Sequence, residues 1–309
     1  IGREISKNVY LERSTSDTSK VPFYKVGCPG AVLMRSTGDH SGIPASVAGR
    51  GICTATGRTF FVAGLYFAEL LQNGSVQIIS HLQTSVGVVR FDNNGDLLFI
   101  VDGRAGYTYD LTSGTFNTVT DSYYPGISDG TSNAPNFVEC LNSYFLVNEQ
   151  NTDKYYWSTP KYIAQAFDAD QPSIKNYWYG LYYAEAKIRP GHIVALAKMA
   201  QYLLVFTNTT IEVHEDTALE TNTWQRVSST FMNVGTTAPA SVSTYQNYVF
   251  WLGNDINGTV GIFMAGMDFS PIKISERGIE QIIQSFDDLT DCIATSFAMD
   301  GHVFTAFYF

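Results

Sequence analysis

The sequence has little charge and few cysteines. Only 16% of its 309 residues are charged, a low share for a soluble monomer, so part of the surface is expected to be covered by other subunits. The four cysteines, Cys28, Cys53, Cys140 and Cys292, are far apart and show no CxxC spacing, which disfavours a zinc site or a disulfide scaffold. Cys53 and Cys140 lie in apolar, strand-like runs, so buried free thiols and a cytosolic folding compartment are expected.

Basic clusters and long apolar runs are also missing. No two lysine or arginine residues are adjacent, and 29 acidic against 19 basic residues give a net charge of −10. Proteins that grip nucleic acid by its phosphates need basic patches, so such binding is disfavoured. Solubility explains the negative charge, and a wall that repels DNA is a second explanation. No apolar run reaches the roughly 18 residues of a transmembrane helix, so membrane insertion is not expected.

Motifs that would carry chemistry are scarce. None of the five histidines forms an HExxH or another close metal pair, and neither a phosphate-binding GxxxxGK[ST] loop nor a GxGxxG turn is present. We therefore expect no catalytic residue, no cofactor and no metal. Asp168 and Asp170 lie beside Phe167 and Tyr177, which would suit a sugar site with two carboxylates. Loop aspartates also form Asx turns and caps, and that interpretation needs no ligand.

A hairpin unit recurs along the chain. In its clearest copy, at 245–274, strands are predicted at Tyr248–Leu252 and Val260–Met264, followed by a third strand that ends at Ile274. Strand, turn and strand recur at the same spacing over 58–80 and 86–119. This rhythm predicts an all-β array and suggests a repeated one.

The predicted fold is a β-propeller of about six blades of antiparallel hairpins, because about 40 residues are typical of one blade. A sandwich of this size would need a domain boundary, and no clear linker is present. One short helix is predicted near the C-terminus, at 275–286, with Ser275 as its cap. Its apolar face is predicted to comprise Ile279, Ile282, Ile283 and Phe286.

Two parts of the chain are distinguished. Residues 1–26 are polar and irregular and are predicted to form an N-terminal arm or extended segment. Residues 27–309 are predicted to form the propeller domain. The sequence stops inside an aromatic strand, so the domain is expected to be truncated at its C-terminal end. Loops that interrupt the hairpin rhythm, at 36–49, 121–136 and 160–182, are the expected places of interaction.

An aromatic cluster in the last of these loops is the candidate interface. Aromatic residues at this density either belong to the core or anchor a subunit contact, and both interpretations stay open. The cluster comprises Tyr177, Trp178, Tyr179, Tyr182 and Tyr183.

Several ordered segments resemble one family. Residues 227–286 contain an FWLG turn at 250–253 and the pattern ISxxxIE at 274–280. The hairpin NNGDLLFIVDGRAGYTYDLTSG at 93–114 and the strand pair LLVFTNTTIEVHED at 203–216 precede them. In this order the segments resemble the packaged-DNA stabilisation family of P22-like podophages, the tail hub or nozzle.

The resemblance implies a non-enzymatic structural protein of the virion, assembled in the host cytoplasm. It implies a homo-oligomer, a hexameric ring beneath the portal and adaptor proteins, which carries a tail needle and tailspikes. Double-stranded DNA would pass through the lumen without specific binding. The alternatives are a propeller that binds or cleaves glycans and a host or bacterial interaction module. Two carboxylates about 5–10 Å apart in an aromatic pocket would favour the glycan enzyme.

Overall fold

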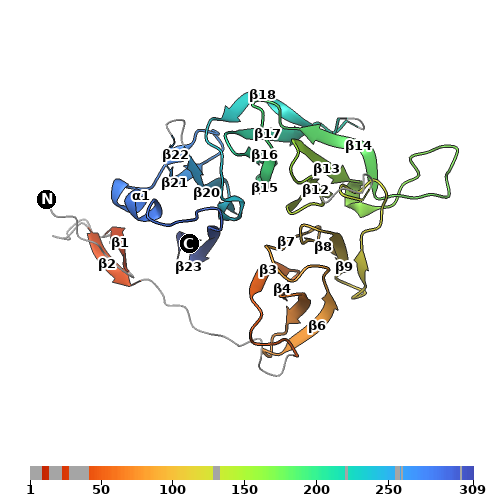
Figure 1. Cartoon of the computed structure of the whole chain (residues 1–309), viewed down its shortest axis with the longest axis horizontal. Coiled ribbons are helices and arrows are strands. Elements are labelled where there is room, and N and C mark those ends of the chain that lie inside the picture. The colour runs from red at the N-terminus through yellow and green to blue at the C-terminus, as the bar shows by residue number, and fades with distance from the viewer. Residues whose placement is uncertain are drawn as a thin grey trace.

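The computed structural model describes most of the chain as an open ring of small antiparallel sheets. Five sheets have four strands each and two sheets have two strands. Figure 1 shows the sheets arranged around a common centre, which confirms the predicted β-propeller. The described residues are 9–13, 23–27, 42–127, 133–219, 222–254, 258, 260–299 and 301–309.

The blades follow one another in chain order. Blade 1 comprises β3 Gly49–Ala55, β4 Arg58–Ala63, β5 Tyr66–Leu70 and β6 Val76–His81. Blade 2 comprises β7 Arg90–Asn93, β8 Leu97–Val101, β9 Gly106–Asp110 and β10 Phe116–Thr118. Blade 3 comprises β11 Val138–Leu141, β12 Tyr144–Asn148, β13 Lys154–Ser158 and β14 Trp178–Glu185. Blade 4 comprises β15 Ile193–Met199, β16 Tyr202–Thr207, β17 Ile211–Asp216 and β18 Trp224–Met232.

Blade 5 comprises β19 Ser243–Tyr245, β20 Tyr248–Asn254, β21 Val260–Ala265 and β22 Ile272–Lys273. A two-stranded sheet of β23 Ile293–Met299 and β24 His302–Tyr308 follows, here called blade 6. The three strands predicted in 245–274 are therefore confirmed as β20, β21 and β22. The prediction of about six blades corresponds to five complete blades and this shorter sheet.

Within each complete blade, consecutive strands pair side by side from the centre of the ring outward. The first strands β3, β7, β11, β15, β19 and β23 pack against one another in that order. They therefore surround the central axis, and the fourth strands form the outer rim (Figure 1).

The second strands are the most apolar because neighbouring blades cover both faces of each sheet. Leu98–Val101 in β8 and Leu203–Phe206 in β16 are continuous apolar runs, and each of these side chains is fully buried. All four tryptophans, at 157, 178, 224 and 251, are also buried. One core cluster extends from blade 3 across blade 4 to blade 5.

The helix is shorter than predicted. α1 spans Arg277–Ile283, and its N-cap residue is Glu276 rather than Ser275. The Ser275 hydroxyl instead accepts a hydrogen bond from the Ile262 amide (3.1 Å) and donates one to Glu280 Oε1 (3.1 Å). This ties the start of the helix to β21.

The predicted apolar face of α1 is mostly not a core face. Ile283 is 2% exposed, whereas Ile279, Ile282 and Phe286 are all exposed. The helical spacing of the apolar residues is present, but only one of the four predicted positions, Ile283, is buried.

The N-terminal segment contains more regular structure than predicted. β1 Val9–Arg13 and β2 Phe23–Gly27 form an antiparallel hairpin within the part predicted to be irregular. The prediction for the cysteines is partly wrong. Cys53 and Cys140 are free but only half-buried, because they lie on first strands that face the axis, whereas Cys292 is buried. Cys28 lies outside the described residues.

Gly235 provides a test of how tightly blades 4 and 5 pack. A Cβ at this position would lie 2.3 Å from Asn208 C and 2.3 Å from Thr209 N, both backbone atoms that cannot rotate away. We expect Gly235→Ala to lower the free energy of unfolding by about 1–3 kcal/mol or more, measured by chemical denaturation. Gly49→Ala is the control, because a Cβ there meets nothing within 4 Å. Equal stability of the two variants would contradict the close approach.

Candidate functional site

The longest excursion from the ring lies between the third and fourth strands of blade 3. A short 3-10 turn, η1 Pro160–Tyr162, ends β13, and the chain then extends outward over residues 163–177 before β14 begins. Figure 1 shows this loop projecting from the rim of the propeller. The sequence predicted an interrupting loop at 160–182; the structure contains a single 3-10 turn and the excursion, whereas residues 178–182 belong to β14.

Hydrogen bonds give the excursion a defined shape. Gln165 and Asn176 pair across it, each amide donating to the other's carbonyl at 2.9 Å. At the tip, the Gln171 amide donates to the Asp168 carbonyl and the Ile174 amide donates to the Gln171 carbonyl. The loop is therefore a hairpin-like projection.

Asp121, in the connection between blades 2 and 3, anchors the base of the excursion. Its Oδ2 accepts hydrogen bonds from the Tyr177 amide (2.6 Å) and the Trp178 amide (3.1 Å). Its Oδ1 accepts one from the Tyr123 amide (3.0 Å). One buried carboxylate thus fixes the residue at which the loop returns to the sheet.

The five aromatic residues predicted as an interface divide between core and surface. Trp178 is 1% exposed and packs against Tyr124 and Phe99, so it belongs to the core. Tyr177 is 38% exposed and stacks on Tyr162, with ring centroids 4.4 Å apart. Trp178 is the first residue of β14 and Tyr177 directly precedes the strand, so the two neighbours have different surroundings.

The other three aromatic residues are half-buried along β14. Tyr179 stacks on Phe167 of the excursion at 4.4 Å, and Tyr182 stacks on Trp157 at 5.9 Å. Tyr183 lies beside Tyr156 and under the Lys154 ammonium group. Of the predicted cluster, Tyr179 and Tyr182 therefore contact the excursion, through Phe167.

Several apolar side chains on the excursion and on β14 remain exposed. Leu181 on β14 is 67% exposed, and Ile163 at the start of the excursion and Ile174 near its tip are both more than half exposed. These three residues lie within the loop predicted for interaction at 160–182, but no aromatic density singles them out in the sequence. We refer to these three exposed side chains and Tyr177 together as the rim patch, which comprises Ile163, Ile174, Tyr177 and Leu181.

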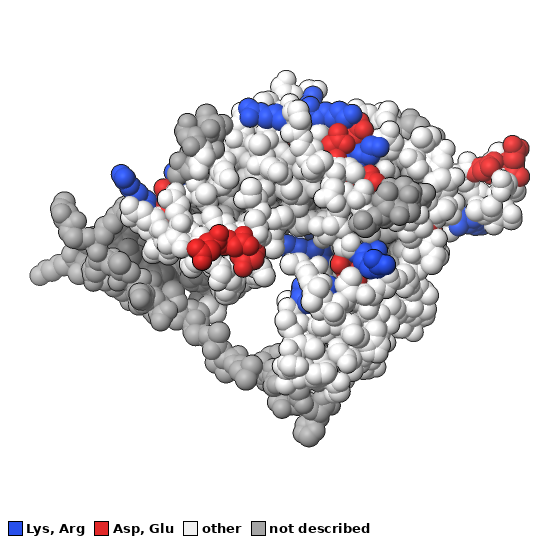
Figure 2. All heavy atoms as spheres, viewed as in Figure 1, with Lys and Arg blue, Asp and Glu red and all other residues white. Residues whose placement is uncertain are grey.

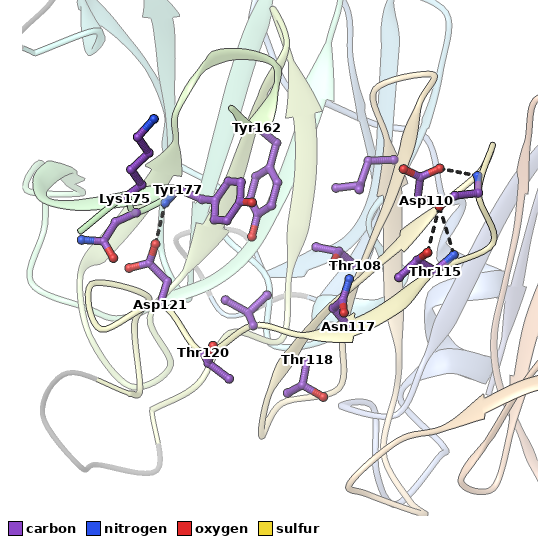
Figure 3. Close-up of a pocket in the computed structure, with 14 residues that line it drawn as sticks. Thr108, Asp110, Thr115, Asn117, Thr118, Thr120, Asp121, Tyr162, Lys175 and Tyr177 are labelled. Atoms are coloured by element: carbon purple, nitrogen blue, oxygen red, sulfur yellow. Dashed lines mark hydrogen bonds between the residues drawn. The ribbon is translucent and has the colours of Figure 1, made fainter. Parts of the chain in front are cut away.

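A groove of about 710 Å³ separates the excursion from the outer edge of blade 2. Figure 3 shows hydroxyl and amide side chains of Thr115, Asn117 and Thr118 along one wall, and the stacked Tyr162 and Tyr177 on the other. Two further cavities, of about 610 and 430 Å³, flank the same excursion.

The carboxylates of the groove are not arranged for hydrolysis. Hydrogen bonds from the backbone amides of Ser113 and Thr112 lower the pKa of Asp110, whereas a general acid needs a raised one. Both oxygens of Asp121 accept backbone amides, as described above. Figure 3 shows the bonds from the Ser113 amide to Asp110 and from the Tyr177 amide to Asp121.

Asp168 and Asp170 do not form a catalytic pair. Asp168 Oδ1 accepts the Asp170 amide at 2.8 Å, which is the Asx-turn arrangement. Both residues are exposed at the projecting loop, where Figure 2 shows an acidic tip. Of the two, only Asp168 lines the adjacent aromatic cavity. The two-carboxylate sugar site is therefore not assembled.

The axis of the propeller holds a charged cluster that joins three blades. Lys198 of β15 contacts the Asp92 carboxylate of β7 and lies 3.8 Å from Glu139 Oε2 of β11. Asp92 Oδ2 also accepts the Cys140 amide at 2.6 Å. Burial and the neighbouring Asp92 raise the pKa of Glu139 to about 8. The cluster binds blades 2, 3 and 4 together at the centre.

A second buried network resembles a catalytic arrangement but has no access to solvent. His214 Nδ1 lies 2.9 Å from the Tyr155 hydroxyl, and its Nε2 lies 3.3 Å from Glu212 Oε2. All three side chains are buried between blades 3 and 4. Burial lowers the pKa of His214, and the hydrogen bond with Glu212 partly offsets this. We interpret the network as a structural contact.

The described ranges offer few other signs of chemistry. No group of three or more His, Cys, Asp or Glu side chains there is placed to hold a metal ion. Within the same ranges, no helix combines the length and apolar character that a membrane crossing requires. The letters GISDG at 126–130 match the GxSxG pattern of hydrolases, but residues 122–127 form turns rather than the strand that a nucleophile elbow needs.

Comparison with known proteins identifies the family. The family described as "Bacteriophage P22 Gp10, beta-propeller" matches residues 23–306, which is most of the chain. The chain belongs to this family. The resemblance predicted from the ordered segments is confirmed, and the chain is a phage stabilisation protein of the P22 Gp10 kind. Family membership implies a structural component of the virion. No curated protein sequence matches the chain.

Solved propellers are similar only in outline. The N-terminal domain of Nup159 has a TM-score of 0.46 at 8% identity, with 95% of this chain and 77% of that chain covered. The Neurospora crassa Pan2 WD40 domain has a TM-score of 0.44 at 10% identity, with 74% and 65% covered. The tricorn protease has a TM-score of 0.42 at 13% identity, with 83% and 25% covered. The chain thus spans less than two thirds of the latter two, and similarities this distant indicate no shared function.

The His214 network predicts a pH dependence of stability. Because the folded state holds the pKa of His214 below its ordinary value of 6.5, the unfolded chain binds the proton more readily. Stability should therefore fall as pH drops below 6.5, by up to ~1.4 kcal/mol at pH 5.5. We expect His214→Gln to remove this part of the slope in denaturation curves recorded between about pH 7.5 and 5.5. The exposed His192, replaced by Gln, is the control, and an unchanged slope in His214→Gln would contradict the prediction.

The Asp121 anchor predicts local protection of the excursion. Asp121→Ala would leave the Tyr177 and Trp178 amides without their acceptor, at a cost of about 1–3 kcal/mol for each amide that stays buried. We expect faster tryptic cleavage after Lys175, followed by mass spectrometry. Asp110→Ala is the matched control, because Asp110 lines the same groove but bonds within its own turn. Equal cleavage rates in the two variants would show that Asp121 does not hold the loop.

Proposed function

We propose that the protein is a tail hub or nozzle subunit that forms a hexameric ring below the portal and adaptor proteins of a phage virion. In this role it stabilises the packaged DNA, forms its exit channel, and attaches the tail needle and tailspikes. The family match over residues 23–306 carries this proposal. The function is non-enzymatic, needs no cofactor, and is performed in the virion after assembly in the host cytoplasm.

The surface chemistry supports an assembled state. Figure 2 shows charged side chains in small separate groups, with most of this face neither acidic nor basic. The rim patch adds exposed apolar side chains to a projecting loop held in a fixed shape. Apolar groups on an ordered projection are typical of a surface that a neighbour covers.

The positions of the exposed groups suit a ring. The excursion of blade 3 and the exposed face of α1 lie on opposite sides of the molecule (Figure 1). Rings form through heterologous contacts, in which two different surfaces of one subunit meet on neighbouring subunits. Two such surfaces on opposite sides of each copy satisfy that requirement.

The net charge of −10 fits a channel for DNA if acidic side chains face the lumen of the ring. Such a lumen would repel phosphates, so that DNA slides without specific binding. A lumen lined by basic or uncharged residues would contradict this part of the proposal.

The decisive measurement is the mass and symmetry of the native assembly, by native mass spectrometry and electron microscopy. We expect rings of six copies, and Leu181→Ser should reduce the ring fraction at least about tenfold, since exposed anchors contribute more to association than to folding. Its melting temperature should change little. Val86→Ser is the matched control, because Val86 is equally apolar and 78% exposed but lies between blades 1 and 2. A stable monomer in the wild type would contradict the hub.

A further inference from the structure

The groove between the excursion and the outer edge of blade 2 has the size of a small-ligand site. Its volume of about 710 Å³ falls within the range of about 300–1,000 Å³ that such sites occupy. One wall comes from β9, β10 and the residues that follow them, and the other comes from Tyr162 and residues 175–177 (Figure 3). Because Asp121 binds the Tyr177 amide, the second wall is held in a fixed position. The groove is therefore preformed.

Polar side chains of both walls lack hydrogen-bond partners. Thr108 is only 7% exposed and lines the groove, yet its hydroxyl bonds to no group in the part of the chain that the structure describes. Asn117 lies directly opposite Thr108 in the β9–β10 pair, so the two side chains share one face of the sheet. The side-chain amides of Asn117 and of Asn176, on the other wall, also have no partner among the described residues. A nearly buried hydroxyl without a partner indicates that its partner comes from the groove.

The excursion contributes an aromatic surface. The rings of Tyr162 and Tyr177 stack with centroids 4.4 Å apart and planes 10° from parallel, and both line the groove. The Tyr162 hydroxyl accepts a hydrogen bond from Trp178 Nε1 (3.4 Å), which helps to fix this ring. The C–H faces of a sugar ring pack on aromatic rings, whereas its hydroxyl groups need donors and acceptors at the same time. An aromatic wall that faces amides and hydroxyls supplies both.

The charges of the groove favour a ligand without charge. Asp110 and Asp121 line it together with one cation, Lys175, so an anion would meet more negative than positive charge. Both oxygens of Asp121 accept backbone amides. Asp110 binds its own turn through Oδ1, which leaves Oδ2 as an acceptor for a ligand hydroxyl. An added peptide strand fits less well, because β10 has only three residues and offers few main-chain groups.

We propose that this groove binds an uncharged oligosaccharide and does not cleave it. A sugar ring packs against the Tyr162–Tyr177 pair, and its hydroxyl groups bond to the Thr108 hydroxyl, the Asn117 amide and Asp110 Oδ2. Neither carboxylate of the groove is arranged as a general acid, so the glycan is held rather than hydrolysed. Hub assembly needs no such site, and the proposal does not depend on the hub function.

A glycan array tests the ligand class. The fluorescently labelled full chain is applied to uncharged bacterial polysaccharides, with alginate and heparin as anionic comparisons. We expect binding to at least one uncharged polysaccharide and none to the anionic ones, and the tightest ligand is then titrated by calorimetry. Absence of binding to every uncharged polysaccharide would overturn the proposal, as would a preference for the anionic ones.

Two exposed positions locate the site. Asn117→Ala and Tyr177→Leu should each weaken binding of that ligand by about fivefold or more, because each removes one proposed contact. Asn247→Ala and Tyr248→Leu are the matched controls, because both residues are exposed but lie at the start of β20 in blade 5. Unchanged affinity in Asn117→Ala and Tyr177→Leu would place any sugar binding elsewhere and overturn the assignment.

Thr108→Val separates a binding role from a structural one. It removes the unpartnered hydroxyl and nearly keeps the shape, so we expect the melting temperature to stay the same or rise while the affinity for the sugar falls about fivefold or more. A lower melting temperature with unchanged affinity would show that the hydroxyl serves the fold. Rings that bind no sugar would overturn this proposal alone, whereas a monomer that binds sugar would contradict only the hub.

Discussion

A propeller blade is a sheet with two apolar faces, and the whole structure depends on each blade having a neighbour on both sides. The run Leu203–Phe206 illustrates this constraint, because a strand without any polar position is soluble only inside a stack of sheets. The apolar core cluster that extends from blade 3 across blade 4 to blade 5 satisfies this constraint, because blade 4 is covered on both faces. At the ends of the array, Ile52 and Ile293 stay exposed. Closure of the ring is therefore a requirement of solubility as well as of shape.

Charged side chains contribute to the packing at the axis of the ring. Asp92, Glu139 and Lys198 come from the first strands of three neighbouring blades and are partly exposed. Removing one partner would leave a partly buried charge uncompensated, which is destabilising. The cluster thus fixes the relative position of blades 2, 3 and 4. Asp121, in the connection between blades 2 and 3, accepts the Tyr177 and Trp178 amides. It therefore fixes the position at which the excursion of blade 3 returns to the sheet.

The sequence was sufficient for the blades because strand and turn signals are local. The strands of 245–274 were predicted from alternating apolar residues and glycine turns, and they lie where expected. Side-chain environments were less predictable, because they depend on which neighbour covers a face. Tyr177 and Trp178 are adjacent in an aromatic run, yet one is exposed and the other is core. The apolar periodicity at 279–286 was likewise real, but only Ile283 is buried, and Phe286 stacks on Phe309 at the surface.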